Sequence, residues 1–156
     1  MAAEVISAQG VKVDVYDSMP SVGRKLLMAG KSGLNITHSD PFDVFVSRYG
    51  SRKDNIEPLL KEFGSEQLRE WVHSLGIDTF IGTSGRVFPY GMKASPLLRA
   101  WLTRLNASNV TLHLRHKWTG ILPSAGGGVP AAEDGGLSHL KTSRTSRLGG
   151  SGFLAI

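Results

Sequence analysis

Hydrophobic and polar side chains alternate along three stretches of the sequence, which is the pattern of half-buried β-strands. Residues 11–17 read VKVDVYD and residues 110–114 read VTLHL, so each stretch places its hydrophobic side chains on one face. A third stretch, 77–81, is followed by the turn residues Gly82-Thr83-Ser84-Gly85. We therefore expect two separate strands and a hairpin that pairs residues 77–81 with 86–88.

Hydrophobic residues at helical spacing fill much of the sequence between these strands. The spacing predicts helices over residues 1–9, 24–29, 56–63, 65–75 and 95–105. Ser65 and Ser95 are the expected N-caps of the last two helices, and Pro96 suits a first helical turn. Gly64 is expected to end the helix over residues 56–63, and Gly76 is expected to end the helix over residues 65–75. Residues 54–76 are thus predicted to form a helical pair outside the parallel sheet.

Strands that alternate with helices are typical of an α/β fold with a parallel sheet. We expect the segments near 11–17 and 110–115 to share one parallel sheet, as in part of a doubly wound, Rossmann-like domain. The first predicted helix runs directly into the strand at 11–17, as in the second half of a β-α-β unit. After Trp118 the periodicity ends, and the Gly/Ser/Arg-rich tail, residues 121–156, is expected to be poorly ordered.

The amino-acid composition excludes several kinds of functional site. The 156 residues include no Cys, which excludes a disulfide framework and a thiolate metal site. The five His show no ligand spacing, so we interpret them as surface residues or as hydrogen-bonded within the fold, and expect no metal. No apolar run approaches the roughly 20 residues of a membrane helix, and no basic region precedes the first apolar residues. We therefore expect a cytoplasmic protein without a membrane partner.

The charge is basic, with a formal net charge of +5 and a pI of about 9.7. Such a balance suits nucleic acids, anionic surfaces or phosphorylated ligands. Acidic residues interrupt the basic stretches, and Trp71 and Trp101 lie on the hydrophobic faces of predicted helices, so we interpret both as core residues and not as base-stacking groups. A basic nucleic-acid-binding module and an inactive structural fragment are the alternatives to a small-ligand domain.

The strand at 11–17 ends in an acidic residue, Asp17. In a dinucleotide-binding β-α-β unit the second strand ends in Asp or Glu, whose carboxylate accepts hydrogen bonds from the adenosine ribose. The Gly-rich phosphate loop of such a unit lies about 20 residues before that acid, and here the count runs past Met1. The strand alone leaves two interpretations open: a ribose ligand, or an acid that merely ends a strand at a turn.

A glycine-rich basic segment follows this strand. Gly23, Arg24 and Lys25 precede residues 29–38, which read AGKSGLNITH. Two cations beside glycines suit a diphosphate, because glycines let main-chain N–H groups approach a flat ligand closely. The Gly-Lys-Ser at 30–32 is not a P-loop, since that motif requires a Gly at position 25. By itself, such a segment is equally typical of a surface loop.

Several motifs occur together in one order. They are VYD at 15–17, GRK at 23–25, GLNIT at 33–37, SGRVFP at 84–89 and KAS at 93–95. In this order and spacing, residues 1–120 resemble the bacterial NAD(P)/FAD-dependent oxidoreductases of the BaiN/RdsA type, which are related to the flavoproteins called YhiN or aminoacetone oxidase-like. The resemblance is specific, because independent motifs coincide.

The resemblance implies a doubly wound FAD-binding domain with smaller inserted domains, FAD across the top of the parallel sheet, and NAD(P)H as the electron donor. It implies that Asp17 holds the adenosine ribose and that Gly23, Arg24 and Lys25 lie beside the FAD phosphates and ribityl chain. It further implies that Gly33, Asn35 and Thr37 lie near the flavin end, and that Arg86 is an electrostatic partner of the flavin or the substrate. It identifies no catalytic residue.

The sequence also departs from this family. The family's first strand and G-x-G-x-x-G loop have no counterpart before residue 11, and the segment beyond Trp118 does not match the family's later strands. We therefore expect residues 1–120 to form a partial FAD-binding domain, with the 54–76 pair covering the site and 121–156 as a disordered or aberrant tail. The implied function is NAD(P)H-linked flavin reduction of an unknown small-molecule substrate, without nucleic acid as a partner. The fragment alone is expected to bind FAD weakly or not at all and to be inactive.

Overall fold

The computed structural model describes residues 1–121, 140–144 and 153–154 of the chain. The chain divides into two compact units. Unit 1 comprises Met1–Val22 and Thr103–Ile156, and unit 2 comprises Gly23–Leu102. Most of the tail predicted at 121–156 lies outside the described residues. Its described parts are strands, β7 (Leu140–Arg144) and β8 (Phe153–Leu154).

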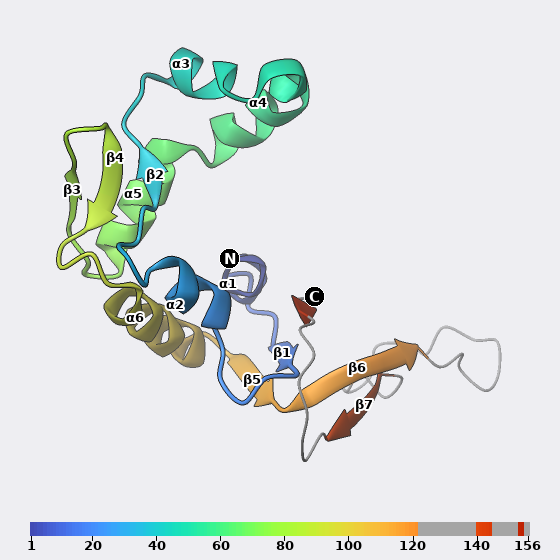
Figure 1. The fold of residues 1–156 in the computed structure, drawn as a ribbon. Helices are drawn as coiled ribbons and strands as arrows, with labels where there is room; N and C mark the ends of the chain where they lie inside the picture. Colours follow the sequence, from blue (N-terminus) through green and yellow to red (C-terminus); the bar gives the residue numbers. More distant parts are fainter. Residues whose placement is uncertain (122–139, 145–152, 155–156) are drawn as a thin grey trace. The chain divides into compact units, whose positions relative to one another are not determined.

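Unit 1 contains the parallel sheet that the sequence predicts. Strand β1 (Val13–Asp17) pairs in parallel with β5 (Val110–Leu114), in a register that runs from Val13 opposite Val110 to Asp17 opposite Leu114. Figure 1 shows the two strands side by side. On the other edge of β1, β8 pairs antiparallel with its last two residues. The prediction of one parallel sheet near 11–17 and 110–115 is confirmed.

Alternation along β1 and β5 gives this sheet one hydrophobic face. Val13 and Val110, which are paired, expose only 5% and 4% of their surface. Helix α1 (Ala2–Ser7) contacts both strands and buries Ala3. An ion pair of 3.1 Å between Glu4 and Arg104 joins α1 to the end of α6 (Ala94–Ala107). The hydrophobic side chains of the two strands therefore form the core of unit 1.

The opposite face of the same sheet is polar. Asp14 and Tyr16 of β1 and His113 of β5 lie on this face, because side chains alternate along each strand. The His113 ring stacks on Tyr16 with centroids 4.6 Å apart, and its Nε2 lies 2.6 Å from Asp14 Oδ1. Beyond β5, β6 (His116–Ile121) pairs antiparallel with β7. His113 is thus half-buried and hydrogen-bonded, as we interpreted the histidines from the sequence.

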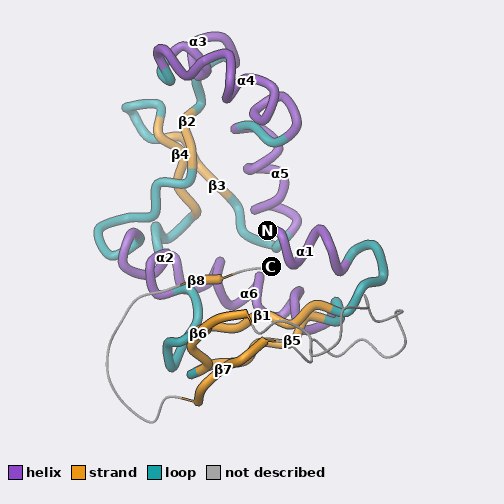
Figure 2. The backbone as a smooth tube through the Cα atoms, turned by 90° about the vertical axis from the view of Figure 1, so that its right-hand side faces the viewer, coloured by secondary structure: helices purple, strands orange, loops and turns teal. Residues whose placement is uncertain are grey.

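Unit 2 is built on a three-stranded antiparallel sheet in the order β2-β4-β3. Strand β3 (Thr79–Ile81) and β4 (Arg86–Pro89) form the predicted hairpin, and β2 (Thr37–His38) adds to the other edge of β4. The sequence analysis did not predict β2, because two residues are too few to show alternation. Figure 2 shows these strands and the helices coloured by type.

The helices of unit 2 are α2 (Arg24–Ala29), α3 (Phe42–Ser47), the 3-10 turn at Gly50–Arg52, α4 (Lys53–Glu62), α5 (Ser65–Ser74) and the first part of α6. The sequence predicted α2, α4, α5 and α6, but not α3 or the 3-10 turn. The predicted helical pair over 54–76 is present as α4 and α5. On α4, a hydrogen bond from Lys61 to Glu57 lowers the pKa of the glutamate carboxyl. Among the described residues, no helix is both long enough and apolar enough to cross a membrane.

Two predicted N-caps are wrong. Helix α5 has Gly64, not Ser65, as its N-cap. The Gly64 N–H donates to Oε1 of Gln67, three residues later in the sequence, at 3.0 Å. The Ser65 hydroxyl instead accepts a hydrogen bond from Thr37 at 2.8 Å. Helix α6 begins at Ala94, which places both Ser95 and Pro96 within its first turn. Proline is tolerated there because first-turn N–H groups have no partner within the helix.

The core of unit 2 gathers residues from the loop before β2, from α5 and from α6. Its buried members are Leu34, Val72, Ala94 and Leu97. Trp71 of α5 and Trp101 of α6 meet edge to face with ring centroids 5.0 Å apart. This contact confirms the interpretation of these two tryptophans as packing residues.

Val87 lies at the centre of the β2-β4-β3 sheet and is fully buried, with 0% of its surface exposed. We expect Val87→Ala to lower the free energy of unfolding by about 2 kcal/mol, because two methyl groups are lost from a packed site. Val44→Ala is the matched control, because Val44 is 48% exposed, and it should change stability by no more than about 0.5 kcal/mol. Urea unfolding of both variants checks the prediction, and equal losses would contradict it.

Candidate functional site

Asp17 stands at the carboxyl end of β1, in the parallel sheet of unit 1. It is 6% exposed, and its Oδ1 accepts a hydrogen bond from the main-chain N–H of Met19 at 2.8 Å. The turn is held further by the Arg115 N–H, which donates to the Met19 carbonyl at 3.1 Å. A carboxylate offers about four acceptor positions, so one main-chain bond leaves it able to accept hydrogen bonds from ligand hydroxyls. Its low exposure makes such bonds stronger than they are in water.

Gly23, Arg24 and Lys25 lie at the start of α2 in unit 2. Gly23 is the N-cap of that helix and has φ of 69°, a left-handed conformation that favours glycine. A Cβ at this position would also lie 2.6 Å from Leu98 Cδ2 of α6. Arg24 and Lys25 follow as exposed residues of the first turn. Gly23 thus lets α2 start close to α6 and places two cations at its outer surface.

The loop from Gly30 to Ile36 follows β4 and the start of α6 closely. The Leu34 N–H donates to the Met92 carbonyl, and the Ile36 N–H donates to the Val87 carbonyl, each at 2.9 Å. Gly33 has φ of 125°, and a Cβ there would lie 2.8 Å from Met92 Cε. Asn35, between the two anchored residues, is exposed. The loop is therefore fixed on one side by main-chain bonds and presents Asn35 on the other.

The register of β2 with β4 separates two of the predicted site residues. Thr37 lies opposite Val87, and His38 lies opposite Arg86. Paired residues share a face of the sheet and neighbours alternate, so Thr37 and Arg86 point to opposite faces. Thr37 is half-buried and bonded to Ser65, whereas Arg86 is exposed. A flat ligand lying on one face of this sheet would therefore meet one of these side chains, not both.

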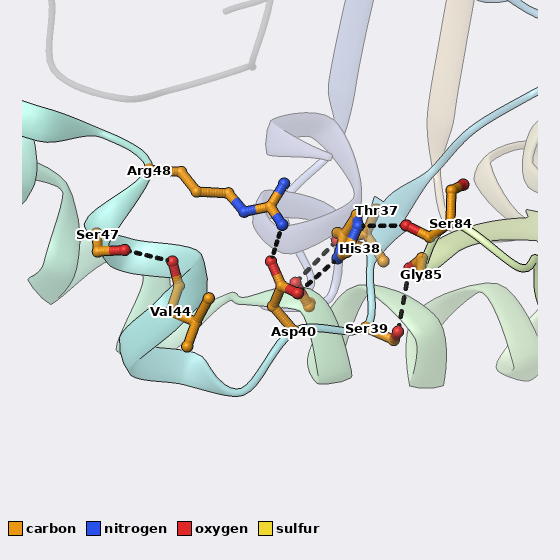
Figure 3. Close-up of polar contacts among 10 residues, drawn as sticks. Thr37, His38, Ser39, Asp40, Val44, Ser47, Arg48, Ser84 and Gly85 are labelled. Atoms are coloured by element: carbon orange, nitrogen blue, oxygen red, sulfur yellow. Dashed lines mark hydrogen bonds and ion pairs between the residues drawn. The ribbon is translucent and has the colours of Figure 1, made fainter.

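His38, which is paired with Arg86 across β2 and β4, belongs to a group of charged residues that the sequence did not reveal. Figure 3 shows this group. His38 Nε2 is 2.9 Å from the Ser84 carbonyl, and His38 Nδ1 is 3.1 Å from Asp40 Oδ1. The other carboxylate oxygen of Asp40 forms an ion pair with Arg48, the C-cap residue of α3. We interpreted His38 only as a surface or hydrogen-bonded histidine. Its position two residues before an aspartate, in an extended segment, was the available signal, since residues i and i+2 share a side.

The eight predicted site residues are distributed over the two units. Asp17 belongs to unit 1, and the other seven belong to unit 2. Within unit 2, Gly33, Asn35 and Thr37 lie on the loop and strand beside β4, which carries Arg86 on the face opposite to Thr37. In the part of the chain that the structure describes, no three His, Asp or Glu side chains are grouped as metal ligands.

Comparison with known protein families shows which family the sequence matches. Residues 1–145 match the family described as HI0933-like protein Rossmann domain. No curated protein matches the sequence significantly. The matched range includes β1, β5 and all eight predicted site residues.

Gly30 lies against Ala94, the first residue of α6. A substitution at Gly30 therefore tests how tightly the loop is packed against this helix. Gly30 has φ of −82°, which any residue adopts, but a Cβ there would lie 2.5 Å from Ala94 Cβ. We expect Gly30→Ala to lower the free energy of unfolding by about 1–3 kcal/mol through overpacking, although an alanine in open space at this φ would stabilise by about 0.4–1 kcal/mol.

The control is the double variant Gly30→Ala/Ala94→Gly, which removes the opposing methyl group. It should be more stable than the sum of the two single changes predicts, as measured by urea unfolding in a double-mutant cycle. Additive effects would show that the loop is not packed against the start of α6.

Proposed function

The chain belongs to the HI0933-like Rossmann-domain family, a family of FAD-dependent oxidoreductases, and we propose that it forms part of the FAD-binding domain of an NAD(P)H-linked enzyme. The proposed substrate is a small molecule, and nucleic acid is not a proposed partner. The observation that carries the proposal is the buried Asp17 at the carboxyl end of a strand in a parallel sheet. Open α/β sheets bind nucleotides at that edge, and an acid at the end of the second strand binds the ribose.

The residues present fit a flavin dinucleotide by the chemistry of their groups. The Asp17 carboxylate suits two ribose hydroxyls, which are hydrogen-bond donors. The exposed cations Arg24 and Lys25 suit the diphosphate. Gly33 and the exposed Asn35 suit the flavin end, where a main chain without a side chain can approach a flat ring.

On the β2-β4 sheet, Arg86 is better suited to contact the bound group than Thr37. The Thr37 hydroxyl already donates to Ser65, while Arg86 is exposed. We therefore assign Thr37 the role of fixing β2 against α5. We assign Arg86 the role of an electrostatic partner for the flavin or the substrate.

In this proposal the chain supplies binding, orientation and electrostatics. FAD, when bound, would supply the redox chemistry. Asp17 would fix the adenosine end by hydrogen bonds, and Arg24 and Lys25 would offset the negative charge of the diphosphate. Arg86 would stabilise negative charge near the flavin end.

A basic nucleic-acid module is less well supported by the charges. Arg48, Lys61 and Arg104 each form an ion pair with an acidic side chain. Part of the positive charge is therefore neutralised within the fold. Retention of the chain on a nucleic-acid column, with no effect of FAD, would favour this alternative.

Protein-observed NMR during titration with FAD tests the proposal and detects binding as weak as millimolar. We expect shifts of the amide signals near Asp17 and Met19, of those from Gly23 to Thr37, and of that of Arg86. Asp17→Asn should weaken binding about tenfold or more, since a hydrogen bond to a charged group contributes about 1.5–3 kcal/mol. Asp43→Asn, an exposed change on α3, should leave the affinity unchanged. Unshifted amides at millimolar FAD would reject the FAD assignment.

The NAD(P)H-linked activity has a separate test. When a strand and a G-x-G-x-x-G loop are added before residue 1, the extended protein with FAD should lose the flavin's visible absorbance to NADH or NADPH faster than free FAD does. Arg86→Ala should leave FAD affinity within about twofold and slow this reduction, because the lost charge acts on the reaction and not on anchoring. The control is Arg52→Ala, at an exposed position. If FAD binds but neither nucleotide reduces it faster, the oxidoreductase part of the proposal fails and the binding part stands.

A further inference from the structure

His38 contacts the β3–β4 turn on one side and Asp40 on the other. Its Nε2 faces the Ser84 carbonyl in the turn, its Nδ1 faces Asp40 beyond β2, and Asp40 in turn pairs with Arg48, the C-cap residue of α3. Figure 3 shows these contacts on both sides of the ring. The His38 and Asp40 side chains are only 18% and 17% exposed. The cluster is thus largely shielded from water and links β2 to the turn and to α3.

The partners of the ring define which of its nitrogens carry hydrogen. A carbonyl oxygen can only accept, so the Nε2 contact of 2.9 Å requires a hydrogen on Nε2. The other ring nitrogen, Nδ1, lies 3.1 Å from Asp40 Oδ1. Among the described residues, neither Nδ1 nor Asp40 Oδ2 has an aligned hydrogen bond. The ring is therefore bonded through Nε2 to the turn and lies beside the Asp40 carboxylate through Nδ1.

Other charges surround the imidazole. Asp40 lies beside the ring, Arg48 at the C-cap of α3 pairs with Asp40, and Arg86 lies opposite His38 on β4. Arg48 is 53% exposed and its charge is therefore screened by solvent. Helix α5, which also contacts β2, meets it through the uncharged Ser65. The α5 side chains of Arg69 and His73 point instead to Thr79 of β3.

The turn that His38 contacts has few other links to β2. Strand β2 has only two residues. Ser39 adds two hydrogen bonds to the Gly85 carbonyl, from its N–H at 2.8 Å and from its hydroxyl at 3.0 Å. Gly85 itself has φ of 77°, and a Cβ there would lie 2.5 Å from the His38 ring. The imidazole therefore lies directly on the backbone of the residue that precedes Arg86.

We propose that His38 is a positioning residue, which fixes the Ser84–Gly85 turn to β2 and thereby holds Arg86 in place for the bound ligand. The proposal rests on the proposed function for the role of Arg86, but not for the attachment of the turn. Asp40 orients the ring through Nδ1, and Arg48 holds Asp40. Neither His38 nor Asp40 is assigned any contact with the flavin or the substrate.

Amide hydrogen exchange in the chain without added FAD tests the attachment. His38→Ala should speed exchange at Ser39 and Gly85 by about two- to tenfold, the effect expected for the loss of one hydrogen bond. The Tyr90 amide, which donates to the Asp78 carbonyl at the other end of the hairpin, should be unchanged. His38→Gln keeps a side-chain N–H donor and should restore protection, which general loss of packing would not allow.

Two further variants, together with His38→Gln, decide the interpretation. His73→Ala removes a histidine bonded to the same sheet through Thr79 and should not affect Ser39 or Gly85. Asp40→Asn removes the charge with little change of shape and should weaken protection in the same direction, which keeps the test valid if His38→Ala does not fold. Unchanged exchange in both His38→Ala and Asp40→Asn, or equal loss in His38→Gln and His38→Ala, overturns the proposal.

A second arm adds FAD. If wild-type amides shift, His38→Ala should reduce the shift at Arg86 and leave the shift at Asp17 unchanged, and an undiminished Arg86 shift would overturn the positioning role. If wild-type amides do not shift, the proposed function fails, and the exchange experiment still decides whether His38 anchors the turn.

Discussion

The parallel pairing of β1 with β5 is the constraint on which the rest of the structure depends. Parallel strands cannot be joined by a tight turn, because the chain must return from the carboxyl end of one to the amino end of the next. All of unit 2, Gly23–Leu102, lies in that return connection. Asp17 is therefore part of the sheet, whereas the other seven predicted site residues are carried by a large insertion with its own sheet and core.

The spacing of hydrophobic residues was sufficient to predict the strands and helices that are buried on one face only. The strand at β5 and the helix α6 were predicted nearly to their ends, because each has a hydrophobic face long enough to show its period. The fold class followed from the order of these elements and from the motif around Asp17. Helix starts were predicted less well, since at α5 the capping interaction comes from Gln67 and not from the serine that local preference favours.

The missing parts of the prediction depend on contacts between distant residues. Strand β2 is defined by its pairing with β4, which joins residues nearly fifty positions apart. The His38 cluster likewise requires the Ser84 carbonyl, a main-chain group that no sequence motif identifies. The eight site residues could be selected from motifs, but the opposite faces of Thr37 and Arg86 follow only from the register, and their contacts with a ligand stay predictions.

The same register restricts how this segment can change in evolution. A shift of β2 by one residue along β4 would exchange the faces of its side chains, so that Thr37 would turn toward solvent and His38 toward the hydrophobic core. The loop is bonded to Met92 and Val87 along its length, so a single deletion between Gly30 and Thr37 would either shift β2 by one residue or break these bonds. Relatives should therefore keep the length of this loop constant even where its sequence varies, and should accommodate insertions at exposed turns such as Thr83.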